Sequence, residues 1–64
     1  MSTALLYKPE AAAAALGIGR SKLFELIAAG AIETVQIGRS RRIPAAALEE
    51  YVDRLRAQLR PDAA

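Results

Sequence analysis

This chain is organised around the stretch Gly17-Ile18-Gly19-Arg20-Ser21-Lys22-Leu23-Phe24-Glu25-Leu26-Ile27. Two glycines within three residues indicate a tight turn, and the residues that follow fit a short helix at 3.6 residues per turn. Leu23, Leu26 and Ile27 share one apolar face of this helix, with Phe24 at its margin. The opposite face holds Ser21, Lys22, Glu25 and Ala28. The helix is therefore expected to pack on a core through one side only.

The outward face is short, polar and positively charged at its amino end, where backbone N–H groups also attract anions. These are the properties of a helix that reads DNA. An ordinary amphipathic helix with a solvated face fits this segment equally well, so the neighbouring segments must decide between the two readings.

The composition narrows the possible functions. A chain of 64 residues makes one domain, and its small core supplies a net stability of only about 3 to 5 kcal/mol. The chain has no Cys and no His, which excludes disulfides, thiolate chemistry, imidazole bases and the usual zinc ligands. The seven carboxylates are spread over separate elements with no nucleophile or metal-ligand cluster beside them. We therefore expect neither an enzyme nor a cofactor, and no small-molecule ligand.

The amino terminus lacks a charged segment followed by a long apolar run, and no stretch approaches the roughly 20 apolar residues of a membrane span. The sequence thus predicts a cytoplasmic protein with no membrane partner.

The positive charge is concentrated in the central third of the chain. The net charge of the whole chain is +2. Residues 20 to 43 contain two acidic residues, Glu25 and Glu33, against five basic ones, Arg20, Lys22, Arg39, Arg41 and Arg42. The rest of the chain is close to neutral. An acidic partner bound through the central third is therefore expected, and nucleic acid is the commonest such partner.

Two short helices are predicted on either side of the glycine turn. Leu5-Leu6-Tyr7 suits a short strand or an extended segment packed on the core, and Pro9 is a good first residue for a helix that Gly17 ends as a left-handed cap. Gly19 is the expected N-cap of the next helix, which runs from about residue 20 to 29 and stops at Gly30. A turn of this length and glycine content is typical of a helix-turn-helix.

After Gly30 the pattern changes to that of a β-hairpin. Residues 34 to 37 alternate with period two, and residues 41 to 43 offer a return strand across Gly38-Arg39-Ser40. Val35, Ile37 and Ile43 are expected to face inward. Arg39, Arg41 and Arg42 flank Ser40 at the tip. Such a cluster alone is typical of a solvated turn, but directly after a helix-turn-helix it indicates a DNA-binding wing.

A last helix is predicted from Pro44. Its apolar stripe is formed by Leu48, Tyr51, Val52, Leu55 and Leu59. Glu50 and Arg54 are spaced for an ion pair at i, i+4, and Pro61 ends the helix before a short tail. We expect this helix to be scaffold that covers the back of the hairpin and the first two helices. The chain is thus predicted to be a single domain, residues 1–64, with its core between about residues 5 and 60.

At this level of detail the chain resembles the small winged helix-turn-helix proteins related to the MerR DNA-binding domain, specifically the excisionase-type modules of phages and integrative elements. The resemblance lies in residues 6 to 10, Leu6-Tyr7-Lys8-Pro9-Glu10; in residues 15 to 21, Ala15-Leu16-Gly17-Ile18-Gly19-Arg20-Ser21; in Gly30; and in residues 37 to 44, Ile37-Gly38-Arg39-Ser40-Arg41-Arg42-Ile43-Pro44. The last block is the most specific. The fold that the resemblance implies is mainly α with a small wing: helix, turn, recognition helix, two-stranded hairpin, helix.

The chain departs from the family pattern near the start of its first two helices. The family usually has Thr or Ser where Lys8 stands and Glu where Ala11 stands, so the expected capping box is missing. Gly19 stands where the family often has Ser, and glycine is a tolerable N-cap. Neither departure changes the expected fold.

The resemblance implies a recombination directionality factor, which binds double-stranded DNA near an attachment site, bends it and biases a tyrosine integrase toward excision. Arg20, Ser21, Lys22 and Glu25 would then enter the major groove, while Arg39, Ser40, Arg41 and Arg42 would hold the backbone or an adjacent minor groove. Further copies are expected to bind cooperatively. Two other functions stay open at this stage, a small transcription regulator and a basic module that binds an acidic protein.

Lys8 is a candidate phosphate contact, because it replaces a capping residue with a positive charge. Replacing Lys8 with Thr should weaken DNA binding and flatten its dependence on salt, since each lost phosphate contact lowers the slope of log K against log salt by about 0.9. Gel shifts over a series of salt concentrations measure both quantities. An unchanged slope would remove Lys8 from the interface.

Overall fold

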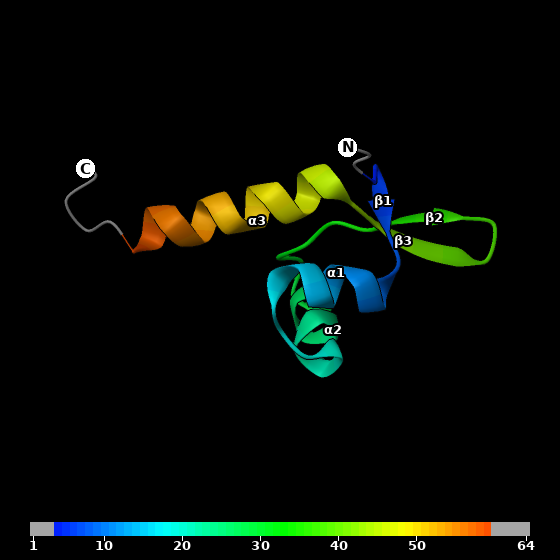
Figure 1. Ribbon diagram of the computed structural model, residues 1–64, viewed down its shortest axis with the longest axis horizontal. Helices are drawn as coiled ribbons and strands as arrows, with labels where there is room; N and C mark the ends of the chain where they lie inside the picture. The colour runs from blue at the N-terminus through cyan, green and yellow to red at the C-terminus, as the bar shows by residue number, and fades with distance from the viewer. Residues whose placement is uncertain (1–3, 60–64) are drawn as a thin grey trace.

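The computed structural model describes residues 4–59 and has the winged helix-turn-helix architecture expected from the sequence (Figure 1). In chain order the elements are β1 (Leu6–Tyr7), α1 (Pro9–Leu16), α2 (Arg20–Ala28), β2 (Val35–Ile37), β3 (Ser40–Pro44) and α3 (Ala45–Gln58). Helices α1 and α2 with the turn between them form the helix-turn-helix, and β2 and β3 form the wing. Figure 1 shows the hairpin projecting from one end of the described chain and the far end of α3 from the other.

The turn between α1 and α2 is fixed by backbone hydrogen bonds at the end of α1. The N–H of Gly17 donates to the carbonyl of Ala14 at 3.1 Å, and the N–H of Ile18 donates to the carbonyl of Ala13 at 3.0 Å. Gly17 has φ of 73°, a left-handed conformation that disfavours residues with a Cβ. A Cβ built on Gly17 would meet no atom within 4 Å. Backbone conformation, and not lack of space, is therefore what requires glycine here.

The hairpin belongs to a three-stranded antiparallel sheet with strand order β1-β3-β2. Tyr7 lies opposite Ile43 in the pairing of β1 with β3. The carbonyl of Leu5 accepts a hydrogen bond from the N–H of Ala45 at 2.9 Å, which ties the start of the described chain to the start of α3. The leading segment is thus a strand, and it holds the central strand β3 from the side opposite β2.

The register of the hairpin corrects the expectation that Val35, Ile37 and Ile43 all face inward. Val35 lies opposite Arg42, and side chains opposite each other in a sheet point to the same face. Because Arg42 and Ile43 are neighbours on β3, Val35 must point away from the side that Ile43 occupies. Ile37 shares the face of Val35 and is 60% exposed. Only Ile43 of these three is fully buried.

The core is small and joins all parts of the fold. Its buried side chains come from α1, α2, the loop after α2, β3 and α3: Ala12, Ala13, Leu23, Ile32, Ile43, Ala47 and Leu48. Leu23 and Ile43 are the largest of the fully buried side chains. Leu26 and Ile27 are partly buried and pack against this cluster together with Leu23, which confirms the predicted apolar face of α2, and Ile18 of the turn packs there as well.

Helix α3 covers the core only with its first half, so the expectation that its whole apolar stripe is scaffold is wrong. Leu48 is buried and Tyr51 packs against the core, whereas Val52 and Leu55 are more than a third exposed and Leu59 is 81% exposed. At 1.5 Å per residue, the 14 residues of α3 extend about 21 Å and the eight residues of α1 only about 12 Å. The second half of α3 therefore reaches past the elements that it could pack on (Figure 1).

The predicted ion pair between Glu50 and Arg54 does not form. The Arg54 guanidinium instead donates a hydrogen bond to the carbonyl of Ala31, in the loop after α2. Arg54 thus links α3 to the helix-turn-helix. The predicted helix end at Pro61 lies outside the described residues. Within residues 4–59, none of the helices has the length and apolar character needed to cross a membrane.

Replacing Leu23 with Ala should cost about 2 to 5 kcal/mol of unfolding free energy, because it removes a fully buried side chain and leaves a cavity. That is comparable to the whole stability expected of a domain of this size, so the variant should be largely unfolded at 25 °C. Urea titration followed by circular dichroism measures the change. Leu5→Ala is the matched control, since Leu5 is 85% exposed and its loss should change stability by less than about 0.5 kcal/mol. Equal losses in the two variants would contradict this description of the core.

Candidate nucleic-acid interface

The exposed surface of α2 carries the side chains predicted to read DNA. Arg20, Ser21, Lys22 and Glu25 are all exposed, while Leu23 between them is buried. Ser21, Lys22 and Glu25 share the outward face, whereas Arg20 lies about 160° around the helix from Lys22, on the side of Phe24. Because Leu23 anchors the helix, this face has a fixed orientation relative to the core.

Two local contacts organise the charged side chains of α2. The guanidinium carbon of Arg20 lies 5.4 Å from the centre of the Phe24 ring, which is within cation–π distance. The Nζ atom of Lys22 lies 3.6 Å from Oε1 of Glu25, and both side chains are more than 60% exposed. An exposed pair of this kind contributes only about 0 to 1 kcal/mol, so Lys22 can exchange it for a phosphate or a base. Arg20, in contrast, is held close to the helix.

The amino end of α2 adds backbone donors to this face. Gly19 is the N-cap, as predicted, and no side chain caps the helix. The first intrahelical bond of α2 runs from the N–H of Leu23 to the carbonyl of Gly19, at 3.1 Å. The N–H groups of the three residues before Leu23 therefore have no partner within the helix. An anion such as a phosphate suits this position.

The wing ends in a two-residue loop, Gly38-Arg39, so Ser40 belongs to β3 and not to the turn. Gly38 has φ of 60°, and Arg39 has an ordinary negative φ. A positive φ at the first loop position alone is the pattern of a type II′ turn, whose twist matches that of the flanking strands. This turn places Arg39 at the outermost point of the hairpin.

The structure separates the predicted wing residues onto two faces. Arg41 lies opposite Gln36 and points to the same side as Ile43, two residues further along β3, which is the side covered by the helices. Ser40 and Arg42 point to the other side, together with Val35 and Ile37. The three arginines therefore do not form a single cluster. Arg41 faces the helix side of the sheet, and Arg42 faces away from it.

The other predicted DNA contacts differ in their exposure and in their hydrogen bonds within the protein. Arg39 and Arg41 are exposed, whereas Arg42 is half-buried, and its Nη1 atom donates to the carbonyl of Arg41 at 3.0 Å. Lys8 is exposed at the N-cap position of α1 and makes no side-chain capping bond. Gln36, which the sequence analysis did not single out, is exposed opposite Arg41 on the same face. The strand register, and not the alternation alone, places Gln36 beside Arg41.

The exposed side chains of α2 and the wing tip are polar and mainly basic. In the part of the chain that the structure describes, no three acidic side chains gather in a way that could hold a metal ion. Basic side chains outnumber Glu25 on α2 and at the wing tip, and the first turn of α2 adds free backbone donors. Both recognise phosphate and the acceptor groups at base edges.

Comparison with known proteins identifies the family to which the fold belongs. Residues 6–56 match the family described as helix-turn-helix domain. A protein of Saccharopolyspora erythraea named "Probable excisionase" is 52% identical over 54 residues, which cover 84% of this chain and 55% of that protein. The chain thus spans about half the length of this relative. No solved structure matches the present chain.

Proposed function

We propose that this chain, which belongs to the helix-turn-helix domain family, binds double-stranded DNA and serves as an excisionase and not as an enzyme. The observation that supports this proposal most directly is the division of α2 into an anchored side and a free side. Leu23 fixes the helix in the core, while Arg20, Ser21 and Lys22 are exposed at its amino end. The similarity to a relative named as a probable excisionase gives the excision role its support.

In this proposal α2 enters the major groove and reads base edges. Arg20 can donate two hydrogen bonds to a guanine, and Glu25 can accept one from a cytosine amino group. Phe24 restricts the Arg20 guanidinium by the cation–π contact, which lowers the entropy lost when the side chain docks. Ser21 and the free N–H groups of the first turn hold the adjacent phosphate.

The wing provides a second grip on the same duplex. Arg41 points to the helix side of the sheet and Arg39 stands at the tip, so these two are the wing residues that we assign to the backbone or to an adjacent minor groove. Lys8 is a further phosphate contact in this proposal. A duplex held by α2 and by the wing is gripped at two separate places, which favours bending.

The proposed excision role requires two further partners besides DNA, an integrase and additional copies of this chain. We assign the site to a region near the attachment site of a phage or integrative element, where the bound and bent DNA directs a tyrosine integrase toward excision. A single module of this size buries only about 600 to 1,000 Å² on DNA and binds weakly. Several copies bound side by side would raise the occupancy of the site.

Two measurements together test the proposed function, a DNA footprint and an assay of excision. The protein should protect a DNA segment next to the attachment site of the element that encodes it. Deletion of the gene for this protein should abolish excision while leaving integration intact. A matched variant that replaces Arg20 with Ala should lose both the footprint and the excision. DNA binding without any effect on excision would favour the role of a transcription regulator.

The division between a reading helix and a clamping wing can be tested with two substitutions. Arg20→Ala should cost about 1 to 3 kcal/mol and relax the preference at one base position, because it removes contacts to a base edge. Arg41→Ala should weaken binding to all sequences by a similar factor, because it removes a contact to the backbone. Affinities for a set of duplexes with single base changes measure both. Identical profiles for the two variants would refute this division.

Cooperativity should be visible in the binding isotherm on a natural site. If several copies bind side by side, the isotherm should be steeper than that of one site, and footprints should spread in steps along the DNA. The control is a short duplex with room for one copy, which should give a simple isotherm with lower affinity. One copy per natural site would contradict this arrangement.

A further inference from the structure

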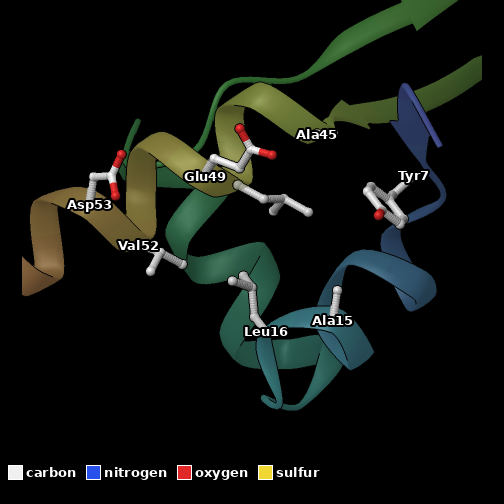
Figure 2. Close-up of a pocket in the computed structure, with 8 residues that line it drawn as sticks. Tyr7, Ala15, Leu16, Ala45, Glu49, Val52 and Asp53 are labelled. Atoms are coloured by element: carbon white, nitrogen blue, oxygen red, sulfur yellow. The ribbon is translucent and has the colours of Figure 1, made fainter. Parts of the chain in front are cut away.

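An open apolar groove of about 300 Å³ runs between α3 and α1, and none of the residues assigned to DNA lines it. Figure 2 shows Val52 of α3 and Leu16 of α1 extending into the same space, with Tyr7 at the other end of the groove. Leu48 also lines the groove, and the carboxylates of Glu49 and Asp53 lie on its α3 side. The groove thus has an apolar floor and an acidic edge.

The outer face of the wing has the complementary character. Ile37 is 60% exposed, although a large apolar side chain in an alternating strand usually faces a core. Val35 and Arg42 flank it on the same face, and this face points away from the helix side that carries Arg41. An exposed apolar side chain with a guanidinium beside it therefore lies on the part of the wing that the DNA assignment leaves free.

From these two surfaces we infer that the outer wing face of one copy docks into the α1–α3 groove of the next copy on DNA. Ile37 enters the apolar floor beside Leu16 and Val52, and Arg42 faces the carboxylates of Glu49 and Asp53. The match combines burial of apolar surface with opposite charges. The inference rests on the proposed binding of several copies and names the surfaces that join them.

The arrangement of the two surfaces sets the symmetry of the contact. The wing projects from one end of the described chain, and the groove lies against α3, whose far end points the other way (Figure 1). A wing-to-groove contact uses different surfaces on the two copies, so it does not close on itself and can repeat along a duplex. A two-fold dimer through α3 would instead use the same surface twice and would stop at two copies.

Cysteine cross-linking can test this contact because the chain has no Cys of its own. Ile37→Cys and Val52→Cys are prepared as separate full-length variants, mixed on long mixed-sequence duplex DNA and oxidised. A disulfide forms only where Cα atoms come within about 4.4 to 6.8 Å. The mixture should give a heterodimer, identified by its intact mass, and a chain with both substitutions should give a ladder of higher oligomers.

The controls separate this contact from random collision and from other pairings. Ile37→Cys mixed with Leu5→Cys should give only background, because Leu5 is exposed but belongs to neither surface. Strong homodimers of Val52→Cys alone would show pairing through α3 and would overturn the inference. A heterodimer yield equal to that of the Leu5 control would overturn it as well.

A charge variant tests the same contact without disulfides and shows which proposal fails. Replacing Glu49 and Asp53 with Lys should abolish the cooperative steepness of binding, while affinity for a single-copy duplex stays equal or rises because two negative charges are lost. Unchanged steepness with intact DNA binding would overturn the wing-to-groove contact alone. If the native chain gives no salt-dependent shift of any duplex, the proposed DNA-binding role fails first.

Discussion

The burial of Leu23 and Ile43 in one small core is the interaction on which the rest of the structure depends. Leu23 belongs to α2 and Ile43 to the central strand of the sheet, so their common burial sets where the helix lies relative to the wing. An exposed basic residue lies close to each of them in the sequence. Lys22 directly precedes Leu23, and Arg41 lies two residues before Ile43. Packing inside the core thereby determines where positive charge appears on the surface.

The helical part of the fold was predictable from the sequence because its signals are local. Pro9, Gly17 and Gly19 mark the helix boundaries through backbone conformation and hydrogen bonding, which need no information from distant residues. The apolar face of α2 follows from the helical period in the same way. These features appear in the structure where the sequence placed them.

The features that could not be predicted depend on pairing and on length. Which face Val35 and Ile37 share was decided by the two-residue loop, and a one-residue change in the assumed turn reverses the face. The exposure of Leu59 follows from the short reach of the elements beneath α3, which the apolar stripe does not reveal. Likewise, the carbonyl that Arg54 contacts belongs to a distant loop. The candidate DNA residues on α2 could be named from the helical period alone, whereas the position of Gln36 beside Arg41 depends on the strand register.

Because the core is small, the lifetime of the protein depends on whether it is bound to DNA. The seven buried residues within 4–59, two of them large and fully enclosed, support a stability of only about 3 to 5 kcal/mol. A duplex that binds only the folded chain adds about 2.7 kcal/mol when its concentration is 100 times the dissociation constant. Unbound copies therefore expose their backbone to proteases far more often than bound copies do. Through its own marginal folding, such a domain limits the pool of free protein and survives longest where it is engaged.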